Sequence, residues 1–223
     1  MLSNRLKVVA DFTKKDDYIV DVGCDHALLS IYLVKNNLVL GAIATDINPN
    51  ALDNAIKNIK YNNLENEIET ILSNGLENID LKRVNTIIIT GMGTNTIKEI
   101  LNTNEKLENI KKIIIQSNNN YYDLRKWVTS LGFFIEDETI TYDNKKYYLT
   151  VCFKKGFKKY SKKDYYWGLI KPENLEYYEF LNISYMKIYK KIPLKKTMKK
   201  LKMFLLIQEL NKIIKYCSAN KIL

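Results

Sequence analysis

The sequence is poor in cysteine and lacks long apolar runs. Its three cysteines, Cys24, Cys152 and Cys217, are odd in number and far apart, which argues against a disulfide scaffold or a zinc site and fits a reducing compartment. No run of about 18 apolar residues occurs, so we expect no membrane-spanning helix. The N-terminal residues contain no apolar stretch typical of a secretory signal. We therefore expect a cytoplasmic protein with no metal centre and no membrane association.

Acidic residues are scarce in only one part of the chain, whose formal net charge is +10. Residues 1–155 contain 19 Lys and Arg and 20 Asp and Glu, whereas residues 156–223 contain 16 and 5. The whole basic excess therefore lies in the last third. A polyanion such as nucleic acid is the partner that this charge favours. The alternative is a lysine-rich helix face that only contacts solvent.

Apolar strand patterns and amphipathic helix patterns alternate over the first 155 residues. The predicted strands are 18–22, 40–46, 67–72, 84–90 and 111–116. The predicted helices are 3–13, 26–36, 48–61, 94–101 and 121–131, and a hairpin of two long strands follows within 133–153. Such alternation of apolar strands with helices predicts a parallel sheet covered on both faces. The closing hairpin suits the α/β Rossmann-like sheet of class I methyltransferases, whereas a TIM barrel would need eight strand–helix units.

The pattern changes from about residue 157, where no strand signal remains. Residues 172–192 and 193–217 both have helical patterns, and Pro193 between them predicts an antiparallel helical hairpin. The second helix carries an apolar stripe of Leu201, Phe204, Leu205, Ile207, Leu210, Ile213 and Ile214. We expect two domains, a Rossmann-like domain at 1–156 and a basic helical hairpin at 157–223. The hairpin packs through its apolar face, and its lysines are free to contact an RNA backbone.

The first strand ends in the turn Asp-Val-Gly-Cys-Asp-His. In a doubly wound sheet, ligands bind at the carboxyl ends of the strands. Gly23 permits a close backbone approach, whereas Asp21 and Asp25 disfavour a pyrophosphate and favour a cation. The G-x-G-x-x-G fingerprint of dinucleotide binding is absent. S-adenosyl-L-methionine fits this turn, because it carries a sulfonium and an amino group and has no phosphate.

The next strands end in comparable polar or glycine-containing turns. These turns contain Asp46 and Ile47, then Asn74 and Gly75, then Gly91, Met92 and Gly93. A carboxylate at Asp46 is placed to accept both ribose hydroxyls, although it is also a candidate cap for the helix that begins near Pro49. The side-chain oxygen of Asn74 is placed to accept a hydrogen bond from the adenine amino group, although Asn-Gly is also a common turn pair. The third turn lies beside the expected position of the methyl group.

These motifs together resemble one family. The segments "DVGCDHALL", "NGL", "TGMGT" and "IIIQSNNNYYDLRKWV" are similar to those of bacterial tRNA (adenine(22)-N1)-methyltransferases, as are "LSNRLKVVADF" and "YYWGLIKPEN". The resemblance extends over essentially the whole chain. It implies an S-adenosyl-L-methionine-binding Rossmann-like domain followed by a coiled-coil-like helical pair. It also implies methyl transfer to N1 of adenine 22 in tRNA.

The resemblance implies roles for individual residues. Those expected to bind the cofactor are Asp21, Gly23, Asp25, His26, Asp46, Ile47, Asn74 and Gly75. Those expected at the transfer site are Gly91, Met92 and Gly93. Those expected to contact the tRNA are Arg5, Gln116, Asn118 and Tyr121. Asn74 stands where the family more often has Asp, and Ser117 departs from a Gln-Pro-Asn-like turn.

Alignment of the reacting atoms is expected to dominate catalysis, because N1 of an unpaired adenine has an exposed lone pair. His26, the single histidine, is then a base, or it orients the turn or caps the following helix. Two rival functions are methylation of another RNA and a non-catalytic tRNA-binding module of the same fold. A nicotinamide dehydrogenase is a distant third, because the glycine fingerprint is missing. We expect a monomer.

Overall fold

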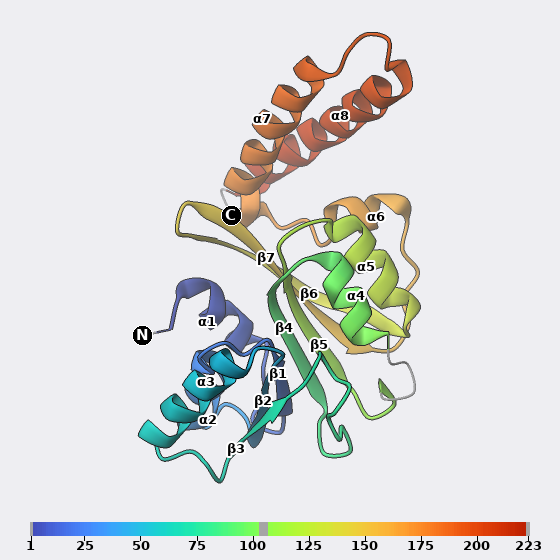
Figure 1. Cartoon of the computed structure of the whole chain (residues 1–223). Helices are drawn as coiled ribbons and strands as arrows, with labels where there is room; N and C mark the ends of the chain where they lie inside the picture. Colours follow the sequence, from blue (N-terminus) through green and yellow to red (C-terminus); the bar gives the residue numbers. More distant parts are fainter. Residues whose placement is uncertain (1, 103–106, 222–223) are drawn as a thin grey trace. The chain divides into compact units, whose positions relative to one another are not determined.

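A mixed seven-stranded sheet organises the N-terminal part of the computed structural model (Figure 1). The structure describes residues 2–102 and 107–221, and its contacts separate into two units, Met1–Gly168 and Leu169–Leu223. The strands are β1 (Tyr18–Val22), β2 (Gly41–Asp46), β3 (Ile68–Leu72), β4 (Thr86–Met92), β5 (Lys112–Ser117), β6 (Phe133–Asp143) and β7 (Lys146–Lys155). Their order is β3-β2-β1-β4-β5-β7-β6, with β1 to β5 parallel and β7 antiparallel to both neighbours. The predicted fold class is confirmed.

Helices cover both faces of this sheet (Figure 1). They are α1 (Asn4–Asp11), α2 (Leu28–Lys35), α3 (Pro49–Tyr61), α4 (Thr94–Leu101), α5 (Tyr121–Ser130) and α6 (Lys162–Trp167). The central strands alternate between two cores: Ile88 packs into the cluster that contains α1, α2 and α3, whereas Ile87 and Ile89 pack into the cluster that contains α4 and α5. Because both faces are buried, these strands read as continuous apolar runs.

The turn between β1 and α2 is longer than the sequence predicts. Helix α2 begins at Leu28 instead of His26, because Asp25 and Ala27 adopt left-handed backbone conformations with φ of 50° and 54°. The residue at the N-cap position is Ala27, with no side-chain cap. The expectation that His26 caps this helix is therefore wrong. By contrast, Asn48 caps α3 by accepting a hydrogen bond from the Asn50 amide at 2.9 Å, as predicted.

The fourth strand continues past its predicted end at residue 90. The β4–β5 register passes from Thr90 opposite Gln116 to Met92 opposite Ser117, so Gly91 is a bulged residue. Its φ of +76° is one that glycine adopts without strain. Bulges are common beside active sites, where they redirect a strand, and this one lies at the carboxyl end of β4.

The boundary between the two units lies at Gly168, later than the predicted boundary at residue 156. Helix α6 belongs to the N-terminal unit because the guanidinium of Arg125 in α5 donates to the carbonyl oxygens of Tyr165 and Tyr166 at 3.0 and 3.2 Å. Arg125 also forms a buried ion pair with Glu138 of β6, with 2.6 Å between Nε and Oε1. These contacts join α5, α6 and β6 into one packed layer.

The C-terminal unit is the predicted helical pair. It consists of a 3-10 turn (Pro172–Asn174), α7 (Leu175–Lys191) and α8 (Thr197–Asn220). The predicted apolar stripe of α8 is only partly buried: Ile207, Leu210 and Ile213 are buried, whereas Leu201 and Leu205, nearer the connecting loop, are 52% and 55% exposed. The two helices thus form their core in the half farther from the loop. None of the helices in the described residues has the length and apolar character needed to cross a membrane.

Candidate functional site

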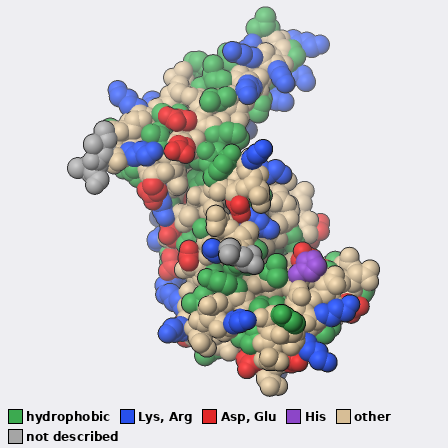
Figure 2. Space-filling model, turned by 90° about the vertical axis from the view of Figure 1, so that its left-hand side faces the viewer, with side chains coloured by type: hydrophobic (Ala, Val, Ile, Leu, Met, Phe, Trp, Pro, Cys, Tyr) green, Lys and Arg blue, Asp and Glu red, His purple; other side chains and the backbone are tan. Residues whose placement is uncertain are grey.

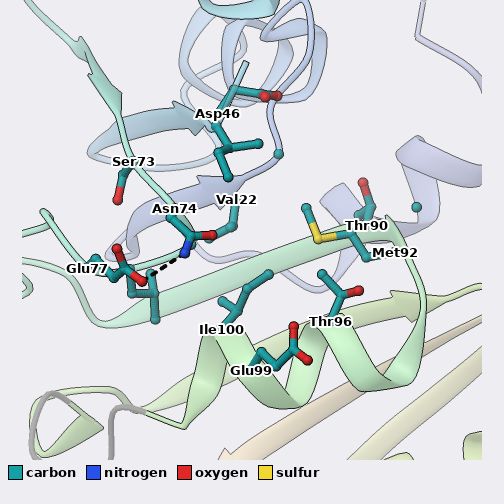
Figure 3. A pocket seen from close by; sticks show the side chains of 15 residues that line it. Val22, Asp46, Ser73, Asn74, Glu77, Thr90, Met92, Thr96, Glu99 and Ile100 are labelled. Atoms are coloured by element: carbon teal, nitrogen blue, oxygen red, sulfur yellow. Dashed lines mark hydrogen bonds between the residues drawn. The ribbon is translucent and has the colours of Figure 1, made fainter. Parts of the chain in front are cut away.

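Two adjoining cavities lie at the carboxyl ends of β1, β2 and β4. One, of about 430 Å³, is lined by Asp46, Ile47, Asn74, Gly75 and Met92 (Figure 3). The other, of about 440 Å³, is lined by Arg5, Asp21, Asp25 and His26. Gly23, Thr90 and Gly91 line both. The strand order places this site where the chain changes direction across the sheet, which is the usual ligand position in such folds.

The turn after β1 forms the neck between the cavities. The amides of Gly23 and Cys24 donate to the Thr45 carbonyl at 2.8 and 2.9 Å, so the turn is held against the end of β2. Gly23 has a φ of +74°, and a Cβ atom added to it would lie 2.3 Å from Cε of Met92. Glycine therefore adopts this backbone conformation without strain, whereas a larger residue would also require the flexible Met92 side chain to move.

Asp21 is a buried carboxyl group that lines the second cavity. Its side chain accepts a hydrogen bond from Ser30 Oγ at 2.8 Å, and the residue is only 3% exposed. Burial raises the pKa of Asp21 to about 6, and the charge of Asp46 adds to the effect, whereas the Ser30 hydrogen bond opposes it. Asp21 forms no ion pair with a described residue. A ligand cation in this cavity would stabilise its ionised form.

Asp46 holds two backbone segments at the end of β2. Its Oδ1 accepts from the Asn48 amide at 2.9 Å, and its Oδ2 accepts from the Asp25 amide at 3.2 Å. The alternative role of Asp46 as a helix cap is excluded, because Asn48 occupies that position in α3. Each carboxylate oxygen retains acceptor capacity toward the cavity. Ile47, which is 66% exposed, provides an apolar surface beside it.

The far side of the first cavity combines an amide and a carboxylate. Asn74 Nδ2 donates to Glu77 Oε1 at 2.8 Å, and Figure 3 shows both residues across the cavity from Thr90 and Met92. Gly75 adopts a φ of +61°, and a Cβ atom there would lie 2.9 Å from Ile100. Glu77 also lines this cavity and was not predicted from the sequence. Thr96, Glu99 and Ile100 of α4 were not predicted either, although their spacing of three and four residues indicates one helix face.

The turn after β4 is held by the segment after β5. Asn118 Nδ2 donates to the Gly91 carbonyl at 2.6 Å, and the Asn118 amide donates to the Met92 carbonyl at 2.8 Å. Asn119 Oδ1 accepts from the Thr94 amide at 3.1 Å, so it fixes the residue after Gly93. Asn118 thus positions the turn that contains Gly91 and Met92, and its contact with tRNA stays a prediction.

Two other residues predicted to contact the tRNA are engaged in contacts within the protein. Gln116 is 1% exposed, its Oε1 accepts from Arg5 Nη1 at 2.9 Å, and its Nε2 donates to Thr150 Oγ1 at 2.9 Å and to the Arg5 carbonyl at 3.2 Å. Both Nε2 hydrogens are used and the side chain is buried, so this amide has no free donor to offer a base. Tyr121 packs its ring against the hydrophobic core, and its hydroxyl donates to the carbonyls of Leu149, at 2.8 Å, and Ser117. Tyr121 thus packs against the core while it remains partly exposed, and its contact with tRNA stays a prediction.

The remaining predicted residues border the second cavity. The Arg5 guanidinium lies 5.5 Å from the centre of the Tyr148 ring, and the Arg5 amide donates to Asp143 Oδ2 at 3.3 Å. His26 Nε2 lies 3.6 Å from Asp25 Oδ1, and its side chain is 48% exposed. The imidazole therefore stands at the solvent side of the cavity. Its backbone carbonyl accepts from Asn58 Nδ2 at 3.0 Å, which ties the turn to α3.

Comparisons with known proteins point to methyl transfer. A family model described as a methyltransferase domain matches residues 2–151. The tRNA (adenine(22)-N(1))-methyltransferase of Bacillus subtilis (strain 168) is 31% identical over 148 residues, which are 66% of this chain and 62% of that protein. The sequence match thus spans less than two thirds of the curated relative.

Structural similarity extends over more of the chain. The crystal structure of Streptococcus pneumoniae Sp1610 in complex with S-adenosyl-L-methionine has a TM-score of 0.86 and 29% identity, and covers 96% of this chain and 100% of that one. The structure of M. capricolum TrmK in complex with S-adenosyl-homocysteine has a TM-score of 0.83 and 33% identity, and covers 98% of each chain. Similar chains therefore bind this cofactor or its product.

Proposed function

Because this chain belongs to the methyltransferase-domain family, and within it to the tRNA (adenine(22)-N1)-methyltransferases, we propose that it methylates N1 of adenine 22 in tRNA. S-adenosyl-L-methionine is the methyl donor. The observation that carries the proposal is the pair of adjoining cavities, which meet at Gly23 and Gly91 and contain Asp46 in one and Asp21 in the other. A single elongated ligand with a cationic centre suits this arrangement.

The side chains fit the two ends of that cofactor. In the first cavity, Asp46 would accept the ribose hydroxyls, whereas Asn74 and Glu77 would accept the adenine amino group. In the second cavity, Asp21 would hold the amino group of the methionine portion. The glycines at the neck leave room that a Cβ atom would occupy. The cofactor supplies a methyl group made electrophilic by its sulfonium.

The protein's own contribution is chiefly to position the acceptor base. N1 of an unpaired adenine is already nucleophilic, so no strong base is needed, and alignment with the methyl group limits the rate. Asn118 and Asn119 fix the turn at Gly91 and Gly93, which determines where the base can lie. The carboxylates of Asp21 and Asp46 provide negative potential for the positive charge that the adenine acquires. Methyl transfer to N1 therefore does not require His26, which lines the second cavity, as a base.

The C-terminal unit is the proposed binding surface for the tRNA backbone. From Lys187 to Lys202 the chain contains eight lysines and no acidic residue, and Figure 2 shows Lys side chains gathered at one end of this helical pair. Leu194 and Met198, in and beside the connecting loop, are 79% and 78% exposed. Lysines on a helical pair neutralise phosphates without reading sequence. Binding should therefore weaken steeply as the salt concentration rises.

The test is a methyl-transfer assay with a labelled methyl donor and tRNA transcripts. We expect label in a tRNA with adenine at position 22 and none when guanine replaces it, with mass spectrometry identifying N1-methyladenosine at that site. The Asp46→Ala variant should lose activity, whereas Asp53→Asn, an exposed change on α3, should retain it. Label at another position or in another RNA would identify a different substrate. Cofactor binding with no transfer to any RNA would indicate a non-catalytic module.

A further inference from the structure

The β6–β7 hairpin projects beyond the edge of the sheet at which the two cavities open. In the pairing of β5 with β7, Gln116 lies opposite Thr150, and β5 ends one residue later, at Ser117. Because each residue of a strand adds about 3.3 Å, residues Lys146 to Tyr148 carry the turn of the hairpin roughly 10 Å past the end of β5. Figure 1 shows the hairpin reaching past β5 on the side of α1.

Two elements that border the site hold the base of this projection. The backbone amide of Arg5 in α1, a residue that lines the second cavity, donates to Asp143 Oδ2 at 3.3 Å. The hydroxyl of Tyr121 donates to the Leu149 carbonyl at 2.8 Å. Tyr121 begins α5, directly after the segment in which Asn118 holds the turn at the end of β4. The hairpin is therefore fixed beside the place where methyl transfer is proposed.

An aromatic pair is exposed near the end of the hairpin. Tyr142 and Tyr147 are cross-strand partners whose ring centres lie 4.9 Å apart, and Tyr142 is 59% exposed. Ile140 and Leu149, two residues farther from the turn and on the same face, pack against the hydrophobic core. The tyrosine pair thus continues an apolar face past the point at which the protein covers it. A tyrosine ring that is already held by its neighbour is a stacking surface with little conformational entropy to lose.

The turn of the hairpin places a lysine where the backbone favours glycine. Asn144 and Lys145 have φ of 47° and 62°, as the central residues do in the type I′ turns that close two-residue hairpins. Asparagine tolerates this conformation, whereas a lysine in it is strained, and strained residues of this kind cluster at functional sites. Lys145 and the adjacent Lys146 are exposed and form no ion pair with a described residue. Both are available to an anion.

The proposed substrate supplies partners for both features. An adenine that leaves its stack to reach the methyl donor uncovers one face of a neighbouring base. Exposed RNA bases stack on aromatic side chains, and lysines neutralise the adjoining phosphates. We propose that Tyr142, supported by Tyr147, stacks on a base next to adenine 22 of tRNA, and that Lys145 and Lys146 bind the phosphates beside it. This inference rests on the proposed function, and it adds an RNA contact on the N-terminal unit.

The first test compares tRNA methylation by tyrosine variants of the full chain. Tyr142→Ala should lower kcat/KM for tRNA by about fivefold to a hundredfold, the effect of losing one stacked base. Tyr142→Phe keeps the ring and should retain most of the activity. Tyr61→Ala makes the same change at a tyrosine that is 87% exposed on α3 and outside both cavity linings, and it should have no effect. The affinity for S-adenosyl-homocysteine should be unchanged in each variant.

The second test identifies the stacked base. Two tRNAs, each with an abasic nucleotide on one side of adenine 22, would be assayed with the wild type and with Tyr142→Ala. One of these tRNAs should make Tyr142→Ala lose its effect, because the two changes remove the same contact. A loss of equal size with the intact tRNA and with both abasic tRNAs would overturn the inference, because Tyr142 would then not stack on either neighbouring base.

The lysines have a separate readout. Lys145→Gly removes the charge and the backbone strain together, so the midpoint of thermal unfolding should rise while tRNA binding weakens. Lys145→Gly and Lys146→Gln should each make the dependence of log affinity on log salt concentration shallower, by roughly 0.7 to 0.9, whereas Tyr142→Ala should leave this slope unchanged. Lys57→Gln, at an exposed position of α3, is the control. A slope that neither lysine variant changes would remove the phosphate contact from the proposal.

The outcomes separate this inference from the proposed function. Unchanged tRNA methylation by Tyr142→Ala, beside an active wild type, would overturn the inference and leave the tyrosine pair as a surface for a different partner. A wild-type chain that methylates no tRNA would refute the proposed function and the inference with it. Circular dichroism melts show whether each variant folds. If Tyr142→Ala does not, Tyr142→Leu, which keeps apolar bulk without an aromatic face, provides the same comparison.

Discussion

The ε-methyl group of Met92 faces Gly23 so closely that a Cβ atom on Gly23 would lie 2.3 Å from it. The turn after β1 and the bulge at the end of β4 therefore meet at the neck between the two cavities. This contact therefore joins the turns that follow β1 and β4, the neighbouring strands between which the chain changes direction across the sheet.

Gly23→Ala should disrupt this neck. The left-handed φ of +74° makes alanine unfavourable by about 1 kcal/mol, and the added methyl displaces Met92. We expect at least a tenfold loss of S-adenosyl-homocysteine affinity by calorimetry. Met92→Ala in the same chain should recover part of this loss, because it removes the steric conflict. An equal loss in the single and double variants would show that backbone strain, and not the methionine, is responsible.

Gly91→Ala separates strain from obstruction. Gly91 and Gly132 have φ of +76° and +85°, and a Cβ atom on either would meet nothing within 4 Å. Each substitution should therefore reduce the free energy of unfolding by a similar amount, about 1 kcal/mol in urea denaturation. Only Gly91 lines the cavities, so only Gly91→Ala should reduce the methyl-transfer rate. Equal activity in the two variants would contradict the placement of the transfer site.

The stability of the fold should depend on the protonation of Asp21. Its pKa is raised from 3.8 to about 6 in the folded chain, chiefly by burial. Between these values the unfolded chain has released a proton that the folded chain retains, so the free energy of unfolding falls as the pH rises through this window. Above pH 6 the ionised carboxyl costs the fold on the order of 2–3 kcal/mol.

Asp21→Asn removes that cost and keeps an acceptor for Ser30. We expect the free energy of unfolding to rise by about 1–3 kcal/mol at pH 8 and to change little at pH 4, measured by urea denaturation. Cofactor affinity should fall at least tenfold, because the ammonium partner is lost. Asp53→Asn is the exposed control on α3. If Asp21→Asn were no more stable than the wild type at pH 8, the ionised Asp21 carboxyl would not destabilise the fold.

The sequence predicts most of this site because strand ends are visible in it. Apolar runs fix β1, β2 and β4, and the residues that follow them, such as Asp46 and Asn74, must meet at one edge of the sheet. Sequence patterns did not distinguish a polar residue that faces a cavity from one that supports it. Gln116 ends an apolar run as Asp46 does, but it is buried because β7 and α1 cover that edge. Such tertiary cover leaves no local signal.

The domain boundary shows the same limit. The loss of strand pattern at residue 157 is real, but α6 joins the N-terminal unit through backbone carbonyls that Arg125 reaches from α5. Because the acceptors are backbone carbonyls, no residue type in the sequence identifies them. In the sequence, Arg125 is indistinguishable from any other arginine in an amphipathic helix. Gly168 is also placed by this cluster, because a Cβ atom there would lie 1.7 Å from Glu138 Oε2.

Two truncations should therefore behave differently. A chain of residues 1–168 keeps the Arg125 contacts and the hydrogen bond from the Ile135 amide to Tyr160 Oη at 2.8 Å, so it should fold and bind S-adenosyl-homocysteine as the full chain does. A chain of residues 1–156 lacks α6 and Tyr160, so it loses these hydrogen bonds and leaves the Arg125–Glu138 ion pair partly exposed. This loss should reduce the free energy of unfolding by several kcal/mol. Urea denaturation and calorimetry provide the two measurements. Equal stability of the two fragments would place the boundary at the earlier position.

The same 1–168 chain tests the role of the basic helices. Without the lysines between Lys187 and Lys202, tRNA affinity should fall, and the dependence of the logarithm of affinity on the logarithm of salt concentration should become shallower, by roughly 0.9 for each duplex phosphate that the protein no longer neutralises. Replacing four of these lysines by glutamine in the full chain should give an intermediate slope with unchanged cofactor affinity. An unaltered slope in both proteins would mean that the tRNA binds the N-terminal unit alone, because the slope falls only when fewer phosphates are neutralised and fewer counterions are released.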